Sequence, residues 1–377
     1  MLDLPDFRLE TFFARWEFDA RHHLTASDAE SMTVAELLAL GSPAERAAFD
    51  ALPLVYQPTW GGPALRAAIA TLYDSCGPDE VLAFAGAEEA LFWTLMELVT
   101  ERDHAIVTVP NYQSMEEVVR ATGASLTGLP LRYDGGWTFD LEDLEKTLRP
   151  NTRLIAVNFP NNPTGFSPDR DVFEALVRLC DERGIWLFSD EVYRGLELEA
   201  HRRLPQAADL SERGISLNVM SKSFGLPGLR IGWVACRDRS MLSRLERRKH
   251  YTSICNAAPS EALAVIALNN RDEIWKKNRQ IISDNLLAFD AFFAKWSDLF
   301  EWYHPDGGCV AFPRYLGDDD CDSFCGELLH REGVLLLPPS IYRSPLLEVP
   351  TDRFRIGVGR RNPEPALEAF DHFLESR

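Results

Sequence analysis

The chain reads Ser221-Lys222-Ser223-Phe224-Gly225-Leu226-Pro227-Gly228-Leu229-Arg230-Ile231-Gly232-Trp233 directly after an apolar run, residues 215–220. Most lysines are hydrated surface charges, so a lysine between two serines at this place invites a chemical interpretation. Burial lowers the pKa of an amine and makes it a nucleophile, as a Schiff base with an aldehyde cofactor requires. The arginine eight residues later can bind a phosphate group by paired hydrogen bonds. The alternative is a surface lysine whose stem lies along apolar groups.

Three further motifs accompany this stretch. They are Asn158-Phe159-Pro160-Asn161-Asn162-Pro163-Thr164-Gly165, Ser189-Asp190-Glu191-Val192-Tyr193 and the late Phe354-Arg355-Ile356. In this order and spacing the motifs resemble the class I/II aminotransferases, enzymes of fold type I that use pyridoxal 5′-phosphate. The resemblance extends over nearly the whole chain, from about Tyr56 to Arg355. It implies an α/β fold and pyridoxal 5′-phosphate as the cofactor.

Length and charge narrow the class of protein. The 377 residues predict two domains, or one large α/β domain with appendages. The 39 basic and 58 acidic residues give a net charge of −19, which opposes binding to nucleic-acid phosphates and to anionic lipid. We therefore expect neither nucleic acid nor a membrane as a partner.

The sequence carries no signal for export. Its first eight residues lack a basic segment followed by an apolar one, and no apolar run approaches the roughly 20 residues that span a bilayer. Seven scattered cysteines fit a reducing cytosol better than a disulfide framework or a zinc site. We expect a cytoplasmic protein without a metal site.

Short β-branched runs alternate with amphipathic stretches between about residues 80 and 250, the pattern of a mostly parallel sheet covered by helices. The stretches 88–98 and 169–183 each carry an apolar stripe at helical spacing. Ligands of such sheets collect at the carboxyl ends of the strands, where Gly86, Asn162, Asp190 and Lys222 fall. The predicted strands are residues 81–85, 105–109, 125–131, 154–158, 185–189, 215–219 and 231–235.

The end of the chain predicts a second domain. After Pro259 a helical pattern runs to Phe292, longer than a typical globular helix, and indicates a connector between domains. In the resembling family both chain ends meet in a small domain. We therefore expect a large cofactor-binding domain over residues 52–270, with a seven-stranded and mostly parallel sheet, and a smaller α/β domain formed by residues 1–51 and 271–377.

The resemblance assigns the cofactor ring to four residues. Lys222 would form the imine with the cofactor and afterwards act as the base at the substrate Cα. Asp190 would pair with the ring nitrogen, and Tyr193 and Asn162 would bind the phenolic oxygen. Taken alone, Asp190 is equally compatible with a helix N-cap, and Asn162-Pro163-Thr164-Gly165 with an ordinary turn.

The phosphate site is expected where a strand turns into a helix. Gly86 lies there, so the amides of Ala87 and Glu88 can point at an anion. Ala87 departs from the commoner family pattern because it lacks a hydroxyl, and Glu88 adds negative charge near a phosphate. Ser221 and Arg230 complete this site.

The resemblance also implies a shared active site. Tyr56 matches a tyrosine that reaches the phosphate from a second subunit, so we expect a homodimer. Tyr112 would stack on the cofactor ring; its alternative is a half-buried loop tyrosine. Arg355 matches the arginine that binds the substrate α-carboxylate by two hydrogen bonds, with Asn162 beside it.

These residues do not determine which reaction is catalysed, since the same set serves transamination, elimination, replacement, cyclisation and oxidation. Transamination between an L-amino acid and a 2-oxo acid leads because it is the most frequent in the family. Residues 12–18 and 84–90 resemble the branch that contains capreomycidine synthase, which closes a ring on a hydroxylated arginine. That likeness makes elimination with cyclisation on an arginine-derived amino acid the alternative, with oxidation as another.

An arginine-like substrate would need a carboxylate in the distal pocket, and Glu17 and Glu88 are the candidates. Each is equally consistent with a solvated or helix-start acid. The neighbouring His22 and His23 cannot both face inward on a strand, so packing or surface positions are favoured for them.

Two other classes of protein are disfavoured. A transcription factor built on this fold carries a basic DNA-binding domain ahead of it, whereas here the resemblance begins within the first tens of residues and the chain is acidic. A catalytically inactive scaffold is disfavoured because Lys222, Asp190 and Arg230 are intact.

Overall fold

A computed structural model describes residues 3–377, so Met1 and Leu2 of the predicted second domain lie outside the described residues. Within them, a seven-stranded sheet has one strand, β10, antiparallel to both neighbours. All seven predicted strands are confirmed, each within two residues of its expected bounds. In spatial order they are β2 (Val81–Phe84), β10 (Gly232–Ala235), β9 (Gly214–Val219), β8 (Trp186–Asp190), β7 (Thr152–Asn158), β3 (His104–Val109) and β4 (Ser125–Pro130).

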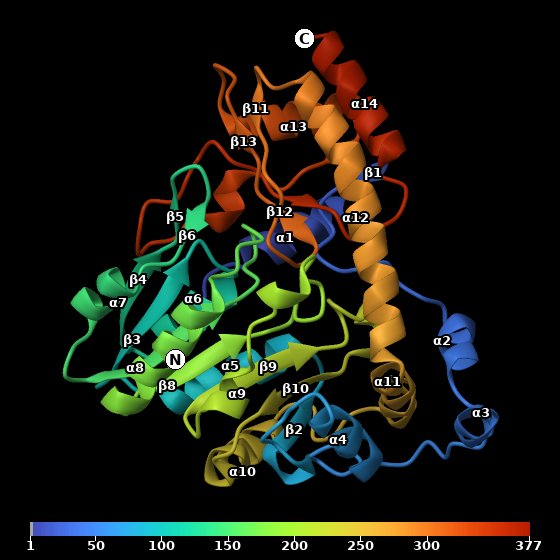
Figure 1. Cartoon of the computed structure of the whole chain (residues 1–377), viewed down its shortest axis with the longest axis vertical. Helices are drawn as coiled ribbons and strands as arrows, with labels where there is room; N and C mark the ends of the chain where they lie inside the picture. The colour runs from blue at the N-terminus through green and yellow to red at the C-terminus, as the bar shows by residue number, and fades with distance from the viewer. Residues whose placement is uncertain (1–2) are drawn as a thin grey trace.

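Helices cover both faces of this sheet (Figure 1). On one face of β9, Ile215 and Leu217 belong to the same core cluster as Leu91 and Leu95 of α5. On the other face, Ala208 N of α9 donates to Ser216 Oγ at 3.0 Å. Strands buried on both faces need apolar residues at most positions, which is why they read as continuous apolar runs. The helices around the sheet are α4 (Pro63–Ala70), η1 (Pro78–Glu80), α5 (Ala87–Leu98), α6 (Gln113–Ala121), α7 (Leu141–Thr147), α8 (Arg170–Arg183), α9 (Ala207–Leu210), η3 (Pro227–Leu229) and α10 (Arg239–Lys249).

The predicted helices at 88–98 and 169–183 are confirmed as α5 and α8. α5 begins after Gly86, whose φ of 103° is readily adopted by glycine but strained for other residues. α8 ends at Gly184 in the left-handed conformation that commonly terminates helices.

The long helix expected from Pro259 to Phe292 is interrupted. It breaks at Asn270 into α11 (Ala258–Asn269) and α12 (Arg271–Lys295). Asn270 has φ −110° and ψ 21°, and its side-chain amide donates to Ile266 O at 2.8 Å. Asparagine competes in this way for backbone hydrogen bonds and so can end a helix. α12 still spans 25 residues, and Figure 1 shows it running from α11 to the side of α14.

The N-terminal segment meets the C-terminal part of the chain in a short sheet. β1 (His22–His23) pairs with β14 (Val334–Leu335) in parallel register, which places the N-terminal segment against the C-terminal part. The division into a domain of residues 52–270 and a second one from both ends stays a prediction. The remaining elements are α1 (Arg8–Trp16), α2 (Val34–Leu40), α3 (Pro43–Asp50), β5 (Arg132–Tyr133), β6 (Trp137–Thr138), η2 (Ala200–Arg202), β11 (Phe300–Glu301), β12 (Val310–Ala311), β13 (Arg314–Tyr315), α13 (Cys321–Glu332), η4 (Pro339–Tyr342), β15 (Ile356–Gly357) and α14 (Glu364–Glu375).

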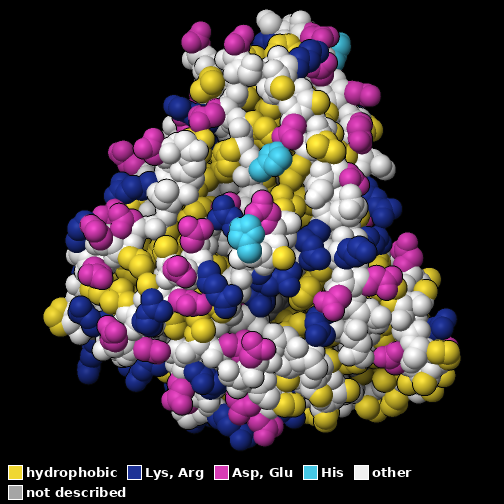
Figure 2. Space-filling model, viewed as in Figure 1, with side chains coloured by type: hydrophobic (Ala, Val, Ile, Leu, Met, Phe, Trp, Pro, Cys, Tyr) yellow, Lys and Arg dark blue, Asp and Glu magenta, His cyan; other side chains and the backbone are white. Residues whose placement is uncertain are grey.

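The surface mixes charges of both signs. Figure 2 shows acidic and basic side chains interspersed over one face, with Lys and Arg gathered near its middle. None of the helices between residues 3 and 377 combines the length and the apolar character that a bilayer crossing needs.

Substitution of Gly232 tests how tightly β10 packs against the turn between β2 and α5. A Cβ added at Gly232 would lie 2.6 Å from Gly86 C and 2.8 Å from Ala87 N, both backbone atoms. We expect Gly232→Ala to lower the free energy of unfolding by about 1–3 kcal/mol, because the backbone must move to relieve the overlap. Gly228→Ala is the matched control, since no atom lies within 4 Å of its added Cβ. Denaturant unfolding measures both, and equal midpoints for the two variants would contradict this packing.

Candidate active site

A cavity of about 550 Å³ opens at the carboxyl ends of β7, β8 and β9, bordered by the N-terminal segment. Gly86 adjoins it through close contact with Arg230, and Arg355 through a hydrogen bond to Asn162. Tyr56 does not line it, and 89% of Tyr56 is exposed. The predicted site residues that line the cavity are Glu17, Ala87, Glu88, Tyr112, Asn162, Asp190, Tyr193, Ser221, Lys222 and Arg230.

Lys222 lies just beyond β9 and is held by the N-terminal segment. Its Nζ donates to Ser27 Oγ at 2.8 Å, and Ala29 N donates to Lys222 O at 3.2 Å. Burial lowers the pKa of Lys222, and the carboxylate of Asp28 opposes this shift only in part. An amine with a lowered pKa is more often neutral and therefore a better nucleophile.

Asp190 ends β8 and is 6% exposed. Burial raises the pKa of Asp190 to about 7, although Val192 N donates to its Oδ1 at 3.2 Å. Asn158 fixes the surrounding backbone, because its Nδ2 donates to Asp190 O at 3.1 Å and its Oδ1 accepts from Asn162 N at 2.7 Å. A buried carboxylate of this kind gains from a bound cation such as a protonated ring nitrogen.

The turn between β2 and α5 forms a cup for an anion. No side chain caps the amino end of α5, so the amides of Ala87 and Glu88 remain available to a ligand. The guanidinium of Arg230 covers this turn so closely that a Cβ on Gly86 would lie 2.6 Å from its Nη2. A phosphate group fits this combination of free amides, a guanidinium and the Ser221 hydroxyl.

The two glutamates after this cup have different roles. Glu89 closes the turn, because it accepts hydrogen bonds from Ala85 N at 2.7 Å and from Ser253 N at 3.1 Å. The side chain of Glu88 instead lines the cavity, where it accepts a hydrogen bond from Ser114 Oγ. Burial raises the pKa of Glu88. The negative charge of Glu88 is thus directed to the cavity and not bound within the turn.

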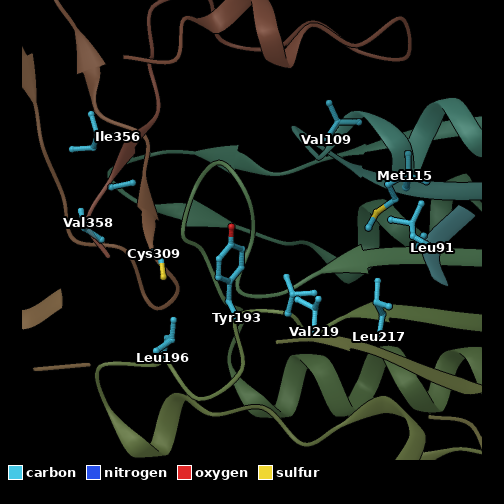
Figure 3. Close-up of a cluster of buried hydrophobic side chains, with 14 of the residues drawn as sticks. Leu91, Val109, Met115, Tyr193, Leu196, Leu217, Val219, Cys309, Ile356 and Val358 are labelled. Carbon is cyan, nitrogen blue, oxygen red and sulfur yellow. The ribbon is translucent and has the colours of Figure 1, made fainter. Parts of the chain in front are cut away.

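Two tyrosines, Tyr112 and Tyr193, line the cavity. Figure 3 shows Tyr193 within the main core cluster, between Val219 and Cys309 in this view. Its buried hydroxyl has no hydrogen-bond partner among residues 3–377. Tyr112 lines the cavity beside Phe7, with ring centroids 5.1 Å apart, and its hydroxyl donates to Glu10 Oε1 at 3.4 Å. An unpartnered buried hydroxyl fits a ligand that supplies an acceptor, as the phenolic oxygen of pyridoxal phosphate does.

Arg355 is fully buried beside the cavity. Its Nη1 donates to Asn162 Oδ1 at 3.0 Å and its Nη2 donates to Thr25 O at 2.8 Å, while its Nε has no partner. Within the described part of the chain no carboxylate forms an ion pair with this guanidinium. A buried unpaired cation is suited to a ligand carboxylate.

The structure adds residues that the sequence interpretation missed. Glu10 and Phe13 line the cavity beside the predicted Glu17, and the spacing of Glu10 and Glu17, two helical turns apart, could have placed Glu10 on the same helix face as Glu17. His23 also lines the cavity, with Nε2 3.9 Å from Glu17 Oε1. Burial raises the pKa of Glu17 and lowers that of His23.

An ion pair between the chain ends was likewise missed. Arg360 Nε and Nη2 donate to Asp28 Oδ1 and Oδ2 at 3.2 and 3.1 Å, and both residues line the cavity. No local pattern marks these residues, because they lie 332 positions apart.

Comparisons with known proteins agree with this geometry. The family described as aminotransferase class I and II matches residues 47–372. Capreomycidine synthase of Streptomyces vinaceus is 31% identical over 96% of this chain and 91% of its own length. The crystal structure of a PLP-dependent aminotransferase from Streptococcus suis has a TM-score of 0.92 at 30% identity, covering 99% of this chain and 98% of that one. The PLP-dependent cyclase OrfR has a TM-score of 0.89 at 27% identity, covering 100% and 98%.

The pKa of Asp190 predicts a pH dependence for the cofactor-free protein. The folded protein holds this proton up to about pH 7, whereas an ordinary aspartate releases it near 3.8. The native state therefore binds more protons between these values, and stability falls as the pH rises from about 4 to about 7. We expect Asp190→Asn to make this decrease in the free energy of unfolding smaller by up to about 4 kcal/mol.

Denaturant unfolding of cofactor-free protein between pH 4.5 and 7.5, about the window that these pKa values define, measures the effect. Asp298→Asn, at an exposed position, is the matched control and should leave the pH profile as in the wild type. An unchanged profile in Asp190→Asn would show that Asp190 ionises as an ordinary carboxylate.

Proposed function

This chain belongs to the class I and II aminotransferase family and uses pyridoxal 5′-phosphate, and we propose that it transfers the amino group of an L-amino acid with a cationic side chain to a 2-oxo acid. One observation carries the substrate choice. The cavity has the buried, unpaired guanidinium of Arg355 beside it and the carboxylates of Glu10, Glu17 and Glu88 in its lining. Such a site can bind both charges of an amino acid that carries a second cation.

Bound pyridoxal phosphate supplies an electrophilic carbon and a conjugated ring that accepts the electron pair left when the substrate loses its Cα proton. Lys222 would attach the cofactor through Nζ and, once displaced, take up the Cα proton and deliver it to the electrophilic carbon of the cofactor. The bond from Nζ to Ser27 Oγ would orient the freed amine. Asp190 would hold a proton on the ring nitrogen, and Tyr193 and Asn162 would donate to the phenolic oxygen.

Arg355 would position the substrate. Its guanidinium is held by Asn162 and by Thr25 O, so a carboxylate bound to it has a defined direction. Fixing the carboxylate sets the orientation of the Cα–H bond relative to the cofactor ring and to Lys222. Positioning of this kind supplies several kcal/mol of rate enhancement in enzymes.

The carboxylates in the cavity lining would select the side chain of the substrate. Burial raises the pKa of both Glu17 and Glu88, and the charge of Glu10 raises that of Glu88 further. A guanidinium or ammonium among them would restore their ionised forms, whereas a neutral side chain would leave like charges facing one another. The binding free energy should therefore depend strongly on the positive charge of the substrate.

We expect arginine to shift the visible absorbance band of the holoenzyme at a concentration roughly tenfold or more below that required for citrulline, its neutral counterpart of similar shape. Glu88→Gln should raise the KM for arginine and leave that for citrulline nearly unchanged. Glu368→Gln, at an exposed position of α14, is the control. Lys222→Ala should lack both the absorbance band and the activity.

Equal responses to arginine and citrulline would contradict the cationic substrate and leave the aminotransferase assignment intact. With a second 2-oxo acid supplied as acceptor, transamination itself is tested in the same reactions: each arginine consumed should yield one 2-oxo acid and convert one acceptor molecule into its amino acid.

A second function is favoured by the comparisons. The similarity to capreomycidine synthase covers nearly all of both chains, and a PLP-dependent cyclase has the same fold. Elimination followed by ring closure on a β-hydroxylated arginine would use the same Arg355, Lys222 and acidic lining. If such a substrate gives a ring-closed product without 2-oxo acid, this function replaces transamination.

We also propose a homodimer in the reducing cytoplasm. Leu54, Tyr56 and Tyr251 are 84, 89 and 88% exposed, which is unusual for large apolar side chains and suits a subunit contact. In that dimer Tyr56 would reach the phosphate of the partner's site. All seven cysteines are free thiols, which supports a reducing compartment.

Mixed dimers test the shared site. Tyr56→Ala and Lys222→Ala should each be impaired, yet a mixed dimer has one site with both Tyr56 and Lys222 intact. Random exchange of subunits should therefore restore about a quarter of wild-type activity per chain. Activity that stays at the sum of the two separate variants would mean that Tyr56 acts within its own chain or not at all.

A further inference from the structure

A second polar cavity lies on the opposite face of β9 from the active site. Leu217 and Val219 line the active-site cavity, whereas Asn218 between them lines the other one, because successive side chains of a strand point to opposite faces. This second cavity has a volume of about 220 Å³ and lies where α12 begins. Its lining residues are Thr71, Leu72, Arg194, Arg203, Asn218, Arg271, Asp272 and Trp275.

Positive charge dominates the lining. Arg203 pairs with Glu197, with Nε 2.9 Å from Oε2. In the described residues neither Arg194 nor Arg271 forms an ion pair; Arg271 Nη1 donates to Thr71 Oγ1 at 3.1 Å and to Leu268 O at 3.2 Å, and Arg194 Nη1 donates to a backbone carbonyl. Asp272 is the one carboxylate of the lining, and its residue is exposed. The buried carboxylate of Glu191 acts on Arg194 from outside the lining, while the lining itself holds three guanidinium groups and one carboxylate.

Two buried donors in this lining have no partner among residues 3–377. Asn218 is 1% exposed and its Nδ2 is unpaired, while its Oδ1 accepts from Val219 N at 2.8 Å and so fixes the orientation of the amide. Trp275 is 5% exposed, and its Nε1 is unpaired as well. A buried N–H without an acceptor is unfavourable by an amount comparable to a lost hydrogen bond. Both donors therefore indicate an acceptor that is not part of the protein.

We propose that this cavity, here called the β9 anion pocket, binds a phosphate-type oxyanion, either free phosphate or the phosphate group of a small metabolite. Guanidinium groups bind such oxygens through paired hydrogen bonds, and Asn218 and Trp275 supply two further donors. The volume of about 220 Å³ is small for a drug-sized ligand and suits a compact anion. This site is independent of the proposed substrate.

The test uses the holoenzyme, because the cofactor phosphate then occupies the cup at α5. Labelling of the indole nitrogens gives one NMR signal for each of the nine tryptophans, and the signal missing in Trp275→Phe identifies Trp275. Inorganic phosphate should shift the Trp275 signal until it saturates and raise the thermal midpoint. Chloride at equal ionic strength should do neither.

Two variants and a control complete the experiment. Asn218→Asp keeps the acceptor for Val219 N and places a carboxylate among the arginines, so it should abolish the response to phosphate without lowering the midpoint in phosphate-free buffer. Arg271→Gln should weaken phosphate binding roughly tenfold. Arg178→Gln, on the exposed side of α8, removes the same charge elsewhere and should behave like the wild type.

Glycerol 3-phosphate distinguishes the two sources of the anion. Tighter binding than inorganic phosphate would assign the pocket to a phosphorylated metabolite, and equal or weaker binding would assign it to free phosphate; both support the site. The proposal is overturned if neither ligand gives a saturable shift of the Trp275 signal, if chloride acts as phosphate does, or if Asn218→Asp responds like the wild type.

Discussion

The desolvation of Lys222 Nζ is the constraint on which the rest of the site depends. An ammonium group removed from water needs an anionic partner or must lose its proton. The acceptor that Nζ reaches is a neutral hydroxyl, Ser27 Oγ, at 2.8 Å. The nearby carboxylate of Asp28 is already bound by both arms of Arg360. In this fold Lys222 Nζ therefore has no carboxylate of its own to pair with, and its amine stays reactive.

This arrangement depends on close contact between three distant parts of the chain. Ser27 and Asp28 belong to the N-terminal segment, Arg360 to the C-terminal part, and Lys222 follows the central strand β9. The backbones approach so closely that a Cβ on Gly359 would lie 2.4 Å from Asp28 O. A side chain at that position would push the ion pair away from the lysine, so packing and the electrostatics of the site are determined together.

Unpaired polar groups mark both faces of β9. On the active-site side they include the Tyr193 hydroxyl and Arg355 Nε; in the β9 anion pocket they include Asn218 Nδ2 and Trp275 Nε1. Folded proteins rarely bury such groups without a partner, which makes these positions informative about ligands. The first pair fits the cofactor and substrate of the family. The second pair lies outside the active site and is the physical reason for assigning a separate ligand to the β9 anion pocket.

The sequence by itself determined the seven strands of the large sheet and the helices α5 and α8, because apolar periodicity and turn residues are local signals. Its short motifs also predicted that the candidate residues around Lys222 belong to one site, and the structure brings them to one cavity. The apolar pattern alone predicts one helix through Asn270, and this prediction is wrong because the backbone breaks there. The tertiary structure alone decided the partners of these residues. Ser27 lies 195 positions from Lys222, and Asp28 lies 332 from Arg360. Contacts at such separations leave no periodic trace in a sequence, so the second cavity and the environment of the lysine emerge only when the chain is folded.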